Sequence, residues 1–144
     1  LFMPKVDDRV DLCNMPSYQT ASVDLFICSH VLEHVPDDRQ AMKELHRILK
    51  AGGKGVLLVP IILGLLAVDE DPSITDSRER WRRFGQDDHV RLYNRAGFVE
   101  RLSEAGFLVR ELGVSHFGPG KLMEQGIEQK SVLYVVEKQP DSSA

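Results

Sequence analysis

Residues 28–38 of this sequence, CSHVLEHVPDD, place two imidazoles and a carboxylate within five positions of one another. His30, Glu33 and His34 are residue types that can take a proton from a substrate or bind a divalent cation. Their spacing brings the three side chains to one face only in a helical conformation, and Pro36 limits that helix to about one turn. The alternative is that both histidines line or cap a loop through backbone hydrogen bonds, while Glu33 accepts from amides of its own turn.

The cluster follows an apolar run, VDLFICS at residues 23–29, which is typical of a strand buried on both faces. Asp37 or Asp38 can cap the helix that begins after the proline. The apolar positions of this helix recur at helical spacing: Ala41, Met42, Leu45, Ile48 and Leu49. Glycines 52–53 are expected to end the helix, and residues 55–59, GVLLV, read as a second buried strand. This order of strand, helix and strand predicts a βαβ unit and an α/β fold.

The rest of the chain has the patterns of further helices and strands. Asp76 can cap a helix over residues 77–84, and residues 94–105 have the pattern of another helix, which Gly106 ends. Residues 107–112, FLVREL, read as a strand. A glycine-rich loop, HFGPG, leads from there to the last strand, SVLYVVEK, which is expected to pair antiparallel with its neighbour.

Composition narrows the class of partner. The 144 residues suffice for one domain, which we expect over residues 1–139, with a disordered end at residues 140–144. The formal charge of -4 disfavours nucleic acid and anionic membranes, and the longest apolar run, residues 57–68, is too short to cross a bilayer. Two isolated cysteines, Cys13 and Cys28, fit a reducing compartment. A cytoplasmic protein with a small-molecule partner is therefore the expectation.

The order DLFICSHVLEHVPDDRQAMKELHRILKAGGKGVLLVP, followed by RFGQDDHVRLY and RLSEAGF, resembles the C-terminal part of a class I S-adenosylmethionine-dependent methyltransferase of the type 11 group. This resemblance implies a partial Rossmann-like sheet made of the family's strands 4, 5, 7 and 6, with strand 7 antiparallel and helices on the faces. It also implies methyl transfer from S-adenosylmethionine to a small-molecule acceptor. The chain would then be a C-terminal portion of a longer parent.

The same resemblance implies residues that contact the cofactor. The opening of the chain, residues 1–16, resembles the family's third strand and the loop after it. Asp11 would bond the adenine amino group there, and Leu12 would supply a backbone amide beside it. Ser29 and His30, where residues 23–29 end, would border the bound cofactor.

Catalytic and metal-binding roles follow from the same likeness. His34 or His89 would be the general base or acid for an in-line methyl transfer. The stretch also resembles the E-x-x-E-H cluster of ubiquinone-biosynthesis O-methyltransferases and small-RNA 2′-O-methyltransferases, with a histidine in place of the first glutamate. His30, Glu33, His34 and His89 would then hold zinc, iron or manganese rather than magnesium, because nitrogen ligands favour the softer ions. The alternative for His89 is a substrate-side or packing role.

Two parts of the family pattern do not occur in this sequence. They are the G-x-G-x-G turn that cradles the cofactor and the strand whose terminal acid holds the ribose. In the family's strand order, residues 23–29 would then form an apolar sheet edge, which is a template for pairing with another chain. The opposing reading is a non-catalytic remnant that associates through this edge, for example as a homodimer.

Residues 61–93 are expected to cover the acceptor pocket, with their apolar side chains lining it or packing in the core. The basic run at residues 78–83 could grip a carboxylate or phosphate, although a solvated helix face is preferred. Gln86, Arg91 and Tyr93 have the polar reach to contact substrate or cofactor.

Overall fold

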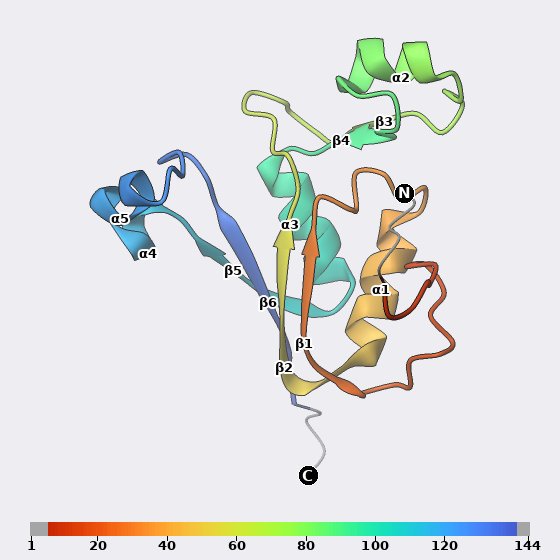
Figure 1. Cartoon of the computed structure of the whole chain (residues 1–144), viewed down its shortest axis with the longest axis vertical. Coiled ribbons are helices and arrows are strands. Elements are labelled where there is room, and N and C mark those ends of the chain that lie inside the picture. Colours follow the sequence, from red (N-terminus) through yellow and green to blue (C-terminus); the bar gives the residue numbers. More distant parts are fainter. Residues whose placement is uncertain (1–5, 141–144) are drawn as a thin grey trace.

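The computed structural model describes residues 6–140 and contains a four-stranded sheet, a separate two-stranded sheet and five helices within that range (Figure 1). The elements in chain order are β1 (Val23–Ser29), α1 (Asp38–Ile48), β2 (Leu49–Leu58), β3 (Asp69–Glu70), α2 (Ser77–Phe84), β4 (Arg91–Leu92), α3 (Arg95–Glu104), β5 (Phe107–Leu112), α4 (Val114–Phe117), α5 (Pro119–Glu124) and β6 (Leu133–Lys138).

The large sheet has the strand order β1-β2-β6-β5. Strand β1 is parallel to β2, whereas β6 is antiparallel to both of its neighbours. This arrangement confirms the predicted α/β class, the βαβ unit and the antiparallel last strand. Because β1 and β2 point the same way, their carboxyl ends meet at one edge of the sheet, where ligands bind in open α/β folds.

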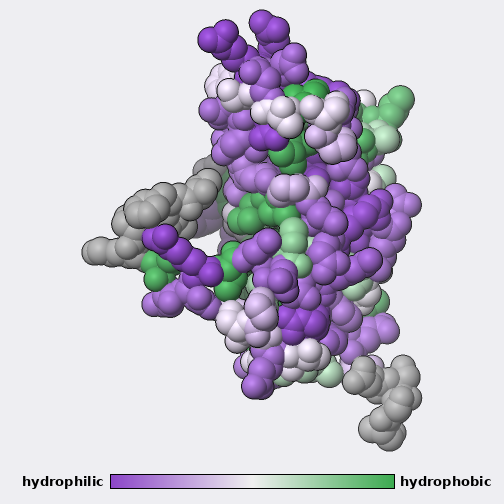
Figure 2. All heavy atoms as spheres, turned by 90° about the vertical axis from the view of Figure 1, so that its right-hand side faces the viewer, coloured by the Kyte–Doolittle hydropathy of each residue, from purple (hydrophilic) through white to green (hydrophobic). Residues whose placement is uncertain are grey.

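Helices α1 and α3 pack on one face of the large sheet. Asp37 caps α1 by accepting from the Gln40 amide, and the inward side of the helix buries Ala41, Met42, Leu45 and Ile48. Full burial of one such aliphatic side chain contributes about 1.5–3 kcal/mol. The outer surface on the α1 side is mostly hydrophilic (Figure 2), as expected for a helix that buries one stripe.

The opposite face of the sheet is exposed at strand β1. Phe26 and Cys28 point into the core, but Leu25 and Ile27 are 58% and 71% exposed. Alternate residues of a strand face opposite sides, so these two side chains lie on the uncovered face. The expectation that residues 23–29 are buried on both faces is therefore wrong. The expectation of an apolar edge strand is confirmed, because β1 is a terminal strand of the described large sheet.

The predicted end of the first helix at glycines 52–53 is also wrong. Helix α1 ends at Ile48 and β2 begins at the next residue, so both glycines lie inside the strand. Val23 pairs with Leu49 whereas Leu25 pairs with Lys54, so β2 bulges between these positions. Gly52 has φ of 73°, a conformation that glycine adopts without a steric penalty. Pairing with β1 therefore overrides the helix-stop signal.

The ends of the chain and the loop after β5 differ from expectation as well. Residues 6–16 form turns rather than the end of a strand, and no described strand lies beside them to accept their backbone groups. Residues 1–5 lie outside the described range. The same holds for residues 141–144 of the predicted disordered end. The predicted loop after β5 contains two short helices, α4 and α5.

The remaining predicted elements are confirmed within one or two residues. Asp76 caps α2, Asn94 caps α3, and Gly106 follows α3 with φ of 100°. Among the described residues no helix is long and apolar enough to cross a membrane, since the longest, α1, has 11 residues.

Candidate functional site

His30 directly follows β1 at the carboxyl edge of the sheet. Its backbone has φ of 53°, in the left-handed region that residues other than glycine seldom occupy. The His30 amide donates to the Leu58 carbonyl at 2.9 Å, which holds this conformation against β2. Strained backbone of this kind persists where the surrounding structure fixes it, and it clusters at functional sites. The imidazole of His30 is therefore presented at the rim of the sheet.

Glu33 is the centre of the predicted cluster and is almost fully buried. Residues 31–35 form one tight turn, in which the His34 amide donates to the Val31 carbonyl. The turn places Glu33 Oε1 3.3 Å from His30 Nδ1, while Glu33 itself is only 2% exposed. Its other oxygen, Oε2, has no hydrogen-bond partner in the described structure. A buried carboxylate oxygen without a partner costs free energy, so the fold does not retain it for stability.

The two other histidines, His34 and His89, lie close to Glu33. The rings of His34 and His89 meet edge to face with centroids 4.7 Å apart. The Val90 amide donates to the Glu33 carbonyl at 2.9 Å, which ties the segment carrying His89 to the turn. Each ring has a buried Nδ1 without a hydrogen-bond partner, although His34 Nδ1 lies 3.3 Å from a carboxylate oxygen of Asp88.

These three side chains could hold one divalent cation. One ligand atom from each of Glu33, His34 and His89 lies within 4.8 Å of the others. Two imidazole nitrogens and one carboxylate oxygen suit zinc, iron or manganese. The fourth predicted ligand, His30, is not part of this group, and its Nδ1 lies 3.3 Å from Glu33 Oε1. Burial and then the charge of Glu33 raise the pKa of Cys28 to about 12.

A cavity of about 510 Å³ opens at the same rim, beyond the ends of β1 and β2. It is lined by His30, Leu58, Val59, Pro60, Ile61, Ile62, Leu63, Arg95, Lys130, Ser131, Val132 and Tyr134. Ile61, Ile62 and Leu63 of the apolar insertion predicted to cover an acceptor pocket line this cavity, and its role as an acceptor pocket stays a prediction. Leu66 of the same insertion is 97% exposed instead. Of the predicted histidines, His30 lines this cavity, whereas His34 and His89 lie in the cluster behind Glu33.

Tyr134, in β6, is a buried polar group that sequence reasoning did not single out. It is 1% exposed, and its ring packs edge to face on Phe98 with centroids 5.0 Å apart. Its hydroxyl has no hydrogen-bond partner in the described structure. Burial and then the charge of Glu111 raise its pKa to about 12, so the hydroxyl remains a neutral donor. The alternating pattern of the last strand could have placed it inside, but not at a cavity.

The predicted cofactor residues lie on two segments. Asp11 Oδ1 accepts from the Cys13 amide at 2.9 Å, so the carboxylate is held in a tight turn while the residue stays exposed. Cys13 Sγ lies 3.3 Å from the Asp37 carbonyl, which brings this turn beside the start of α1. Leu12 is half-buried next to it, and Ser29 ends β1 with its side chain exposed. Their contacts with a cofactor stay predictions.

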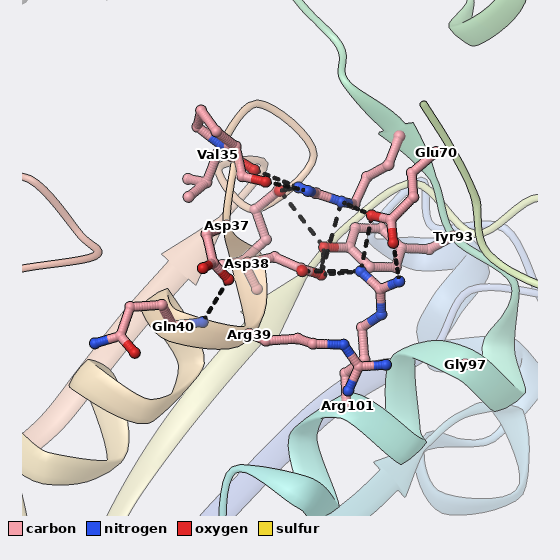
Figure 3. A network of polar contacts seen from close by, with 12 residues as sticks. Val35, Asp37, Asp38, Arg39, Gln40, Glu70, Tyr93, Gly97 and Arg101 are labelled. Atoms are coloured by element: carbon pink, nitrogen blue, oxygen red, sulfur yellow. Dashed lines mark hydrogen bonds and ion pairs between the residues drawn. The ribbon is translucent and has the colours of Figure 1, made fainter. Parts of the chain in front are cut away.

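A second buried polar group lies beside the cluster and is fully paired (Figure 3). Arg101 donates to both oxygens of Asp38, at 2.8 and 2.7 Å, and to Glu70 at 2.6 Å. Arg91 donates to Glu70 and to the carbonyls of Leu32, Val35 and Pro36, which belong to the turn around Glu33. We call Arg91, Arg101, Asp38 and Glu70 the arginine network.

The arginine network corrects the idea that Arg91 and Tyr93 reach a ligand. Both are buried, and the Tyr93 hydroxyl donates to Asp38. The network instead joins the turn of the cluster to strands β3 and β4 and to helix α3. Arg101 stands three residues after Phe98, on the buried side of α3. This helical spacing from an apolar residue was the sequence signal that could have revealed the network.

The basic run on α2 behaves as a solvated face. Arg83 donates to Asp69 and Asp71 at 2.7 Å each, and it is 37% exposed. This pairing agrees with the preferred reading of that run.

Comparisons with known proteins identify the fold. Residues 7–57 match the sequence model of a family described as a methyltransferase domain. The YcgJ protein of Bacillus subtilis has a solved structure that matches 92% of this chain and 70% of its own, with 16% identity and a TM-score of 0.59. An S-adenosylmethionine-dependent methyltransferase from Mesorhizobium loti matches 91% of this chain and 68% of its own, with 17% identity and a TM-score of 0.56.

A third structure is phosphoethanolamine N-methyltransferase 2 of Haemonchus contortus, which has 14% identity and a TM-score of 0.59 over 90% of this chain and 36% of its own. No curated protein matches the sequence. The likeness to class I methyltransferases inferred from the sequence is confirmed, and so is the Rossmann-like fold.

Proposed function

We propose that this chain forms the acceptor side of an S-adenosylmethionine-dependent methyltransferase that acts on a small molecule. One observation carries the proposal. The segment that matches a methyltransferase domain, residues 7–57, contains β1 and the turn that bring His30 to the rim of a largely apolar cavity, with Glu33 buried 3.3 Å from the imidazole. A longer parent, which would supply further contacts to the cofactor, is part of the proposal.

The residues present offer a partial fit to S-adenosylmethionine, which when bound supplies an electrophilic methyl group. The exposed Asp11 carboxylate, fixed in its turn, can accept from an adenine amino group, and Leu12 can contribute its backbone amide. Ser29 and His30 would face the other end of the cofactor, because Ser29 is the last residue of β1 and His30 follows it at the rim. This assignment rests on the position of the two segments at one edge of the sheet.

The cluster can handle the proton that the acceptor loses. Glu33 Oε1, next to His30 Nδ1, orients the imidazole and leaves Nε2 to accept a proton from an acceptor hydroxyl or amine. Bound S-adenosylmethionine would supply the methyl group, and His30 would accept the proton that the acceptor atom loses. Glu33 would stabilise the resulting imidazolium. His34 and His89 remain the acid or base predicted from sequence.

A divalent cation is the second part of the proposed site. One ligand atom from each of Glu33, His34 and His89 lies close enough to the others to bind one ion. Among the described residues Glu33 Oε2 and His89 Nδ1 have no hydrogen-bond partner, whereas His34 Nδ1 lies 3.3 Å from Asp88. Such an ion would neutralise the buried carboxylate and fix the orientation of its ligands. Zinc, iron or manganese matches this donor set.

The test is methyl transfer by the full-length protein. Tritiated S-adenosylmethionine is supplied with a small-molecule extract, and label in products other than the cofactor is counted. We expect transfer by the wild type and a loss of about 100-fold or more in Glu33→Gln, because the variant removes the charge that orients His30. Glu100→Gln, on the exposed side of α3, is the matched control and should keep full activity. Absence of labelled product with the wild type would contradict the proposed function.

A second candidate function is a non-catalytic module that associates through β1. The exposed Leu25 and Ile27 favour it, since a parallel strand pair is ordinarily covered on both faces. A second copy of the chain, pairing along the open edge, would cover both the free backbone groups and these side chains.

A further inference from the structure

We infer that the cavity at the strand tips binds a small molecule that has an apolar body and a carboxylate, and that Tyr134, Arg95 and Lys130 hold the carboxylate. The inference rests on the proposed function insofar as this molecule would be the methyl acceptor. It adds the chemical class of the ligand.

The hydroxyl of Tyr134 is the first reason. It is buried and has no partner within the described residues, and Tyr134 is among the residues that line the cavity. A buried donor that the fold leaves unpaired costs about 1–3 kcal/mol, which an acceptor atom on a ligand would restore. The ring is held in place by Phe98, so the hydroxyl is positioned before any ligand arrives.

The charge of the cavity wall is the second reason. The wall contains two cationic side chains, Arg95 and Lys130, and no aspartate or glutamate. Arg95 is also the first residue of α3, where the helix dipole favours a negative charge. Both cations already contact an acid outside the wall: Arg95 pairs with Glu111 at 2.5 Å and Lys130 with Glu128 at 2.8 Å.

These existing pairs do not prevent ligand binding. Arg95 is 64% exposed, and both members of the Lys130 pair are about as exposed, at 65% and 67%. Both members of the Lys130 pair are exposed, so the pair contributes little to stability and Lys130 can turn to a carboxylate in the cavity at small cost. Glu111 is only 27% exposed, but its bond to Arg95 uses Nε, and the guanidinium has further N–H donors. An anionic ligand would therefore gain from the cations, while a cationic ligand would be repelled.

The rest of the wall suits the apolar body of the ligand. Leu58, Ile61, Ile62 and Val132 line the space between the cationic side and His30. His30 follows β1 and Tyr134 belongs to β6, with β2 between them. By ordinary strand spacing the two positions are about 10 Å apart. A one-ring acid with a short side chain could thus place its carboxylate at Tyr134 and its far end toward His30.

Calorimetric titration of the protein with trans-cinnamate and trans-cinnamamide tests the inference. The two probes share one carbon skeleton and differ in charge. We expect cinnamate to bind at least about tenfold more tightly than the amide, the effect of one charge-assisted hydrogen bond. Equal affinity for the two probes, or no binding of cinnamate at millimolar concentration, would overturn the inference.

Three variants locate the carboxylate. Tyr134→Phe keeps the packed ring and should weaken cinnamate about fivefold to tenfold. Arg95→Gln and Lys130→Gln should each reduce the preference for cinnamate over the amide, whereas Lys121→Gln, an exposed lysine outside the cavity, should not. Thermal melting checks that each variant folds. Unchanged cinnamate binding in both Tyr134→Phe and Lys130→Gln would show that the carboxylate lies elsewhere and contradict the inference.

These titrations need neither S-adenosylmethionine nor turnover. If the protein binds cinnamate but transfers no methyl group, the inferred ligand class is supported and the proposed function is contradicted. If it transfers a methyl group but does not distinguish the two probes, the proposed function is supported and the inferred ligand class is contradicted.

Discussion

The arginine network and the cluster around Glu33 are neighbouring buried polar groups of opposite character. In the network, Asp38 receives Arg101 and Tyr93, and Glu70 receives both arginines. In the cluster, a carboxylate oxygen and two imidazole nitrogens have no hydrogen-bond partner. Polar groups that are fully paired within the fold maintain structure, whereas groups that the fold leaves unpaired are available to a ligand. The comparison therefore assigns stability to the first region and chemistry to the second.

The largest expected effect is on the network. Arg101→Met would leave Asp38 buried without its main cation, and we expect a loss of about 3–5 kcal/mol in the free energy of unfolding. Chemical denaturation measures it. Arg82→Met, at an exposed arginine of α2, should change stability by less than about 0.5 kcal/mol. A small effect of Arg101→Met would remove the contrast between the two regions.

The cluster should respond in the opposite way. Glu33→Gln removes a buried charge with an unpaired oxygen, so we expect unfolding free energy to change by less than about 1 kcal/mol. Cation binding should fall at least about tenfold in the same variant and in His89→Gln. Zinc and manganese titrations by calorimetry, with elemental analysis of protein purified without chelator, supply the measurement. Full retention of zinc binding in both variants would exclude this cluster as the cation site.

Acid should weaken the network at Glu70. Hydrogen bonding to Arg101 is the main cause that lowers the pKa of Glu70 from 4.5 to about 2. Because the folded state favours the ionised carboxylate, Glu70 stabilises the fold above about pH 4.5, and this stabilisation is lost as the pH falls toward about 2. As the pH falls through this range, the free energy of unfolding should therefore decrease less in Glu70→Gln than in the wild type. Identical pH dependence of the two proteins would show that Glu70 is not coupled to folding.

The smallest effect on the folded monomer is expected at the open face of β1. Ile27→Lys changes a side chain that is 71% exposed, so monomer stability should stay within about 0.5 kcal/mol. If copies of the chain pair along β1, the same variant should shift sedimentation from dimer toward monomer. Thr20→Lys, at an exposed position before β1, is the control. A wild type that sediments as a monomer at all concentrations would contradict association through this edge.

Local patterns in the sequence were sufficient for the elements and the fold class. Alternating and helical apolar spacing, with Asp37 or Asp38 and Asp76 as candidate caps, identified the main strands and all three longer helices. These signals act over a few residues, so they can be read without knowing the fold. The end of α1 is the exception, because pairing of β1 with β2 decided where the strand begins.

The site could be anticipated only in part. The sequence pointed to His30, Glu33 and His34 because they lie within five positions of one another. It pointed to His89 only through the resemblance to a family. Only the tertiary structure separated His30, at the cavity, from His34 and His89 behind Glu33. It also revealed Tyr134 and the arginine network, because a hydrogen-bond partner far along the chain, or its absence, is a property of packing. Residue types determined which chemistry this protein could perform, and the meeting of distant segments decided which groups remain free to perform it.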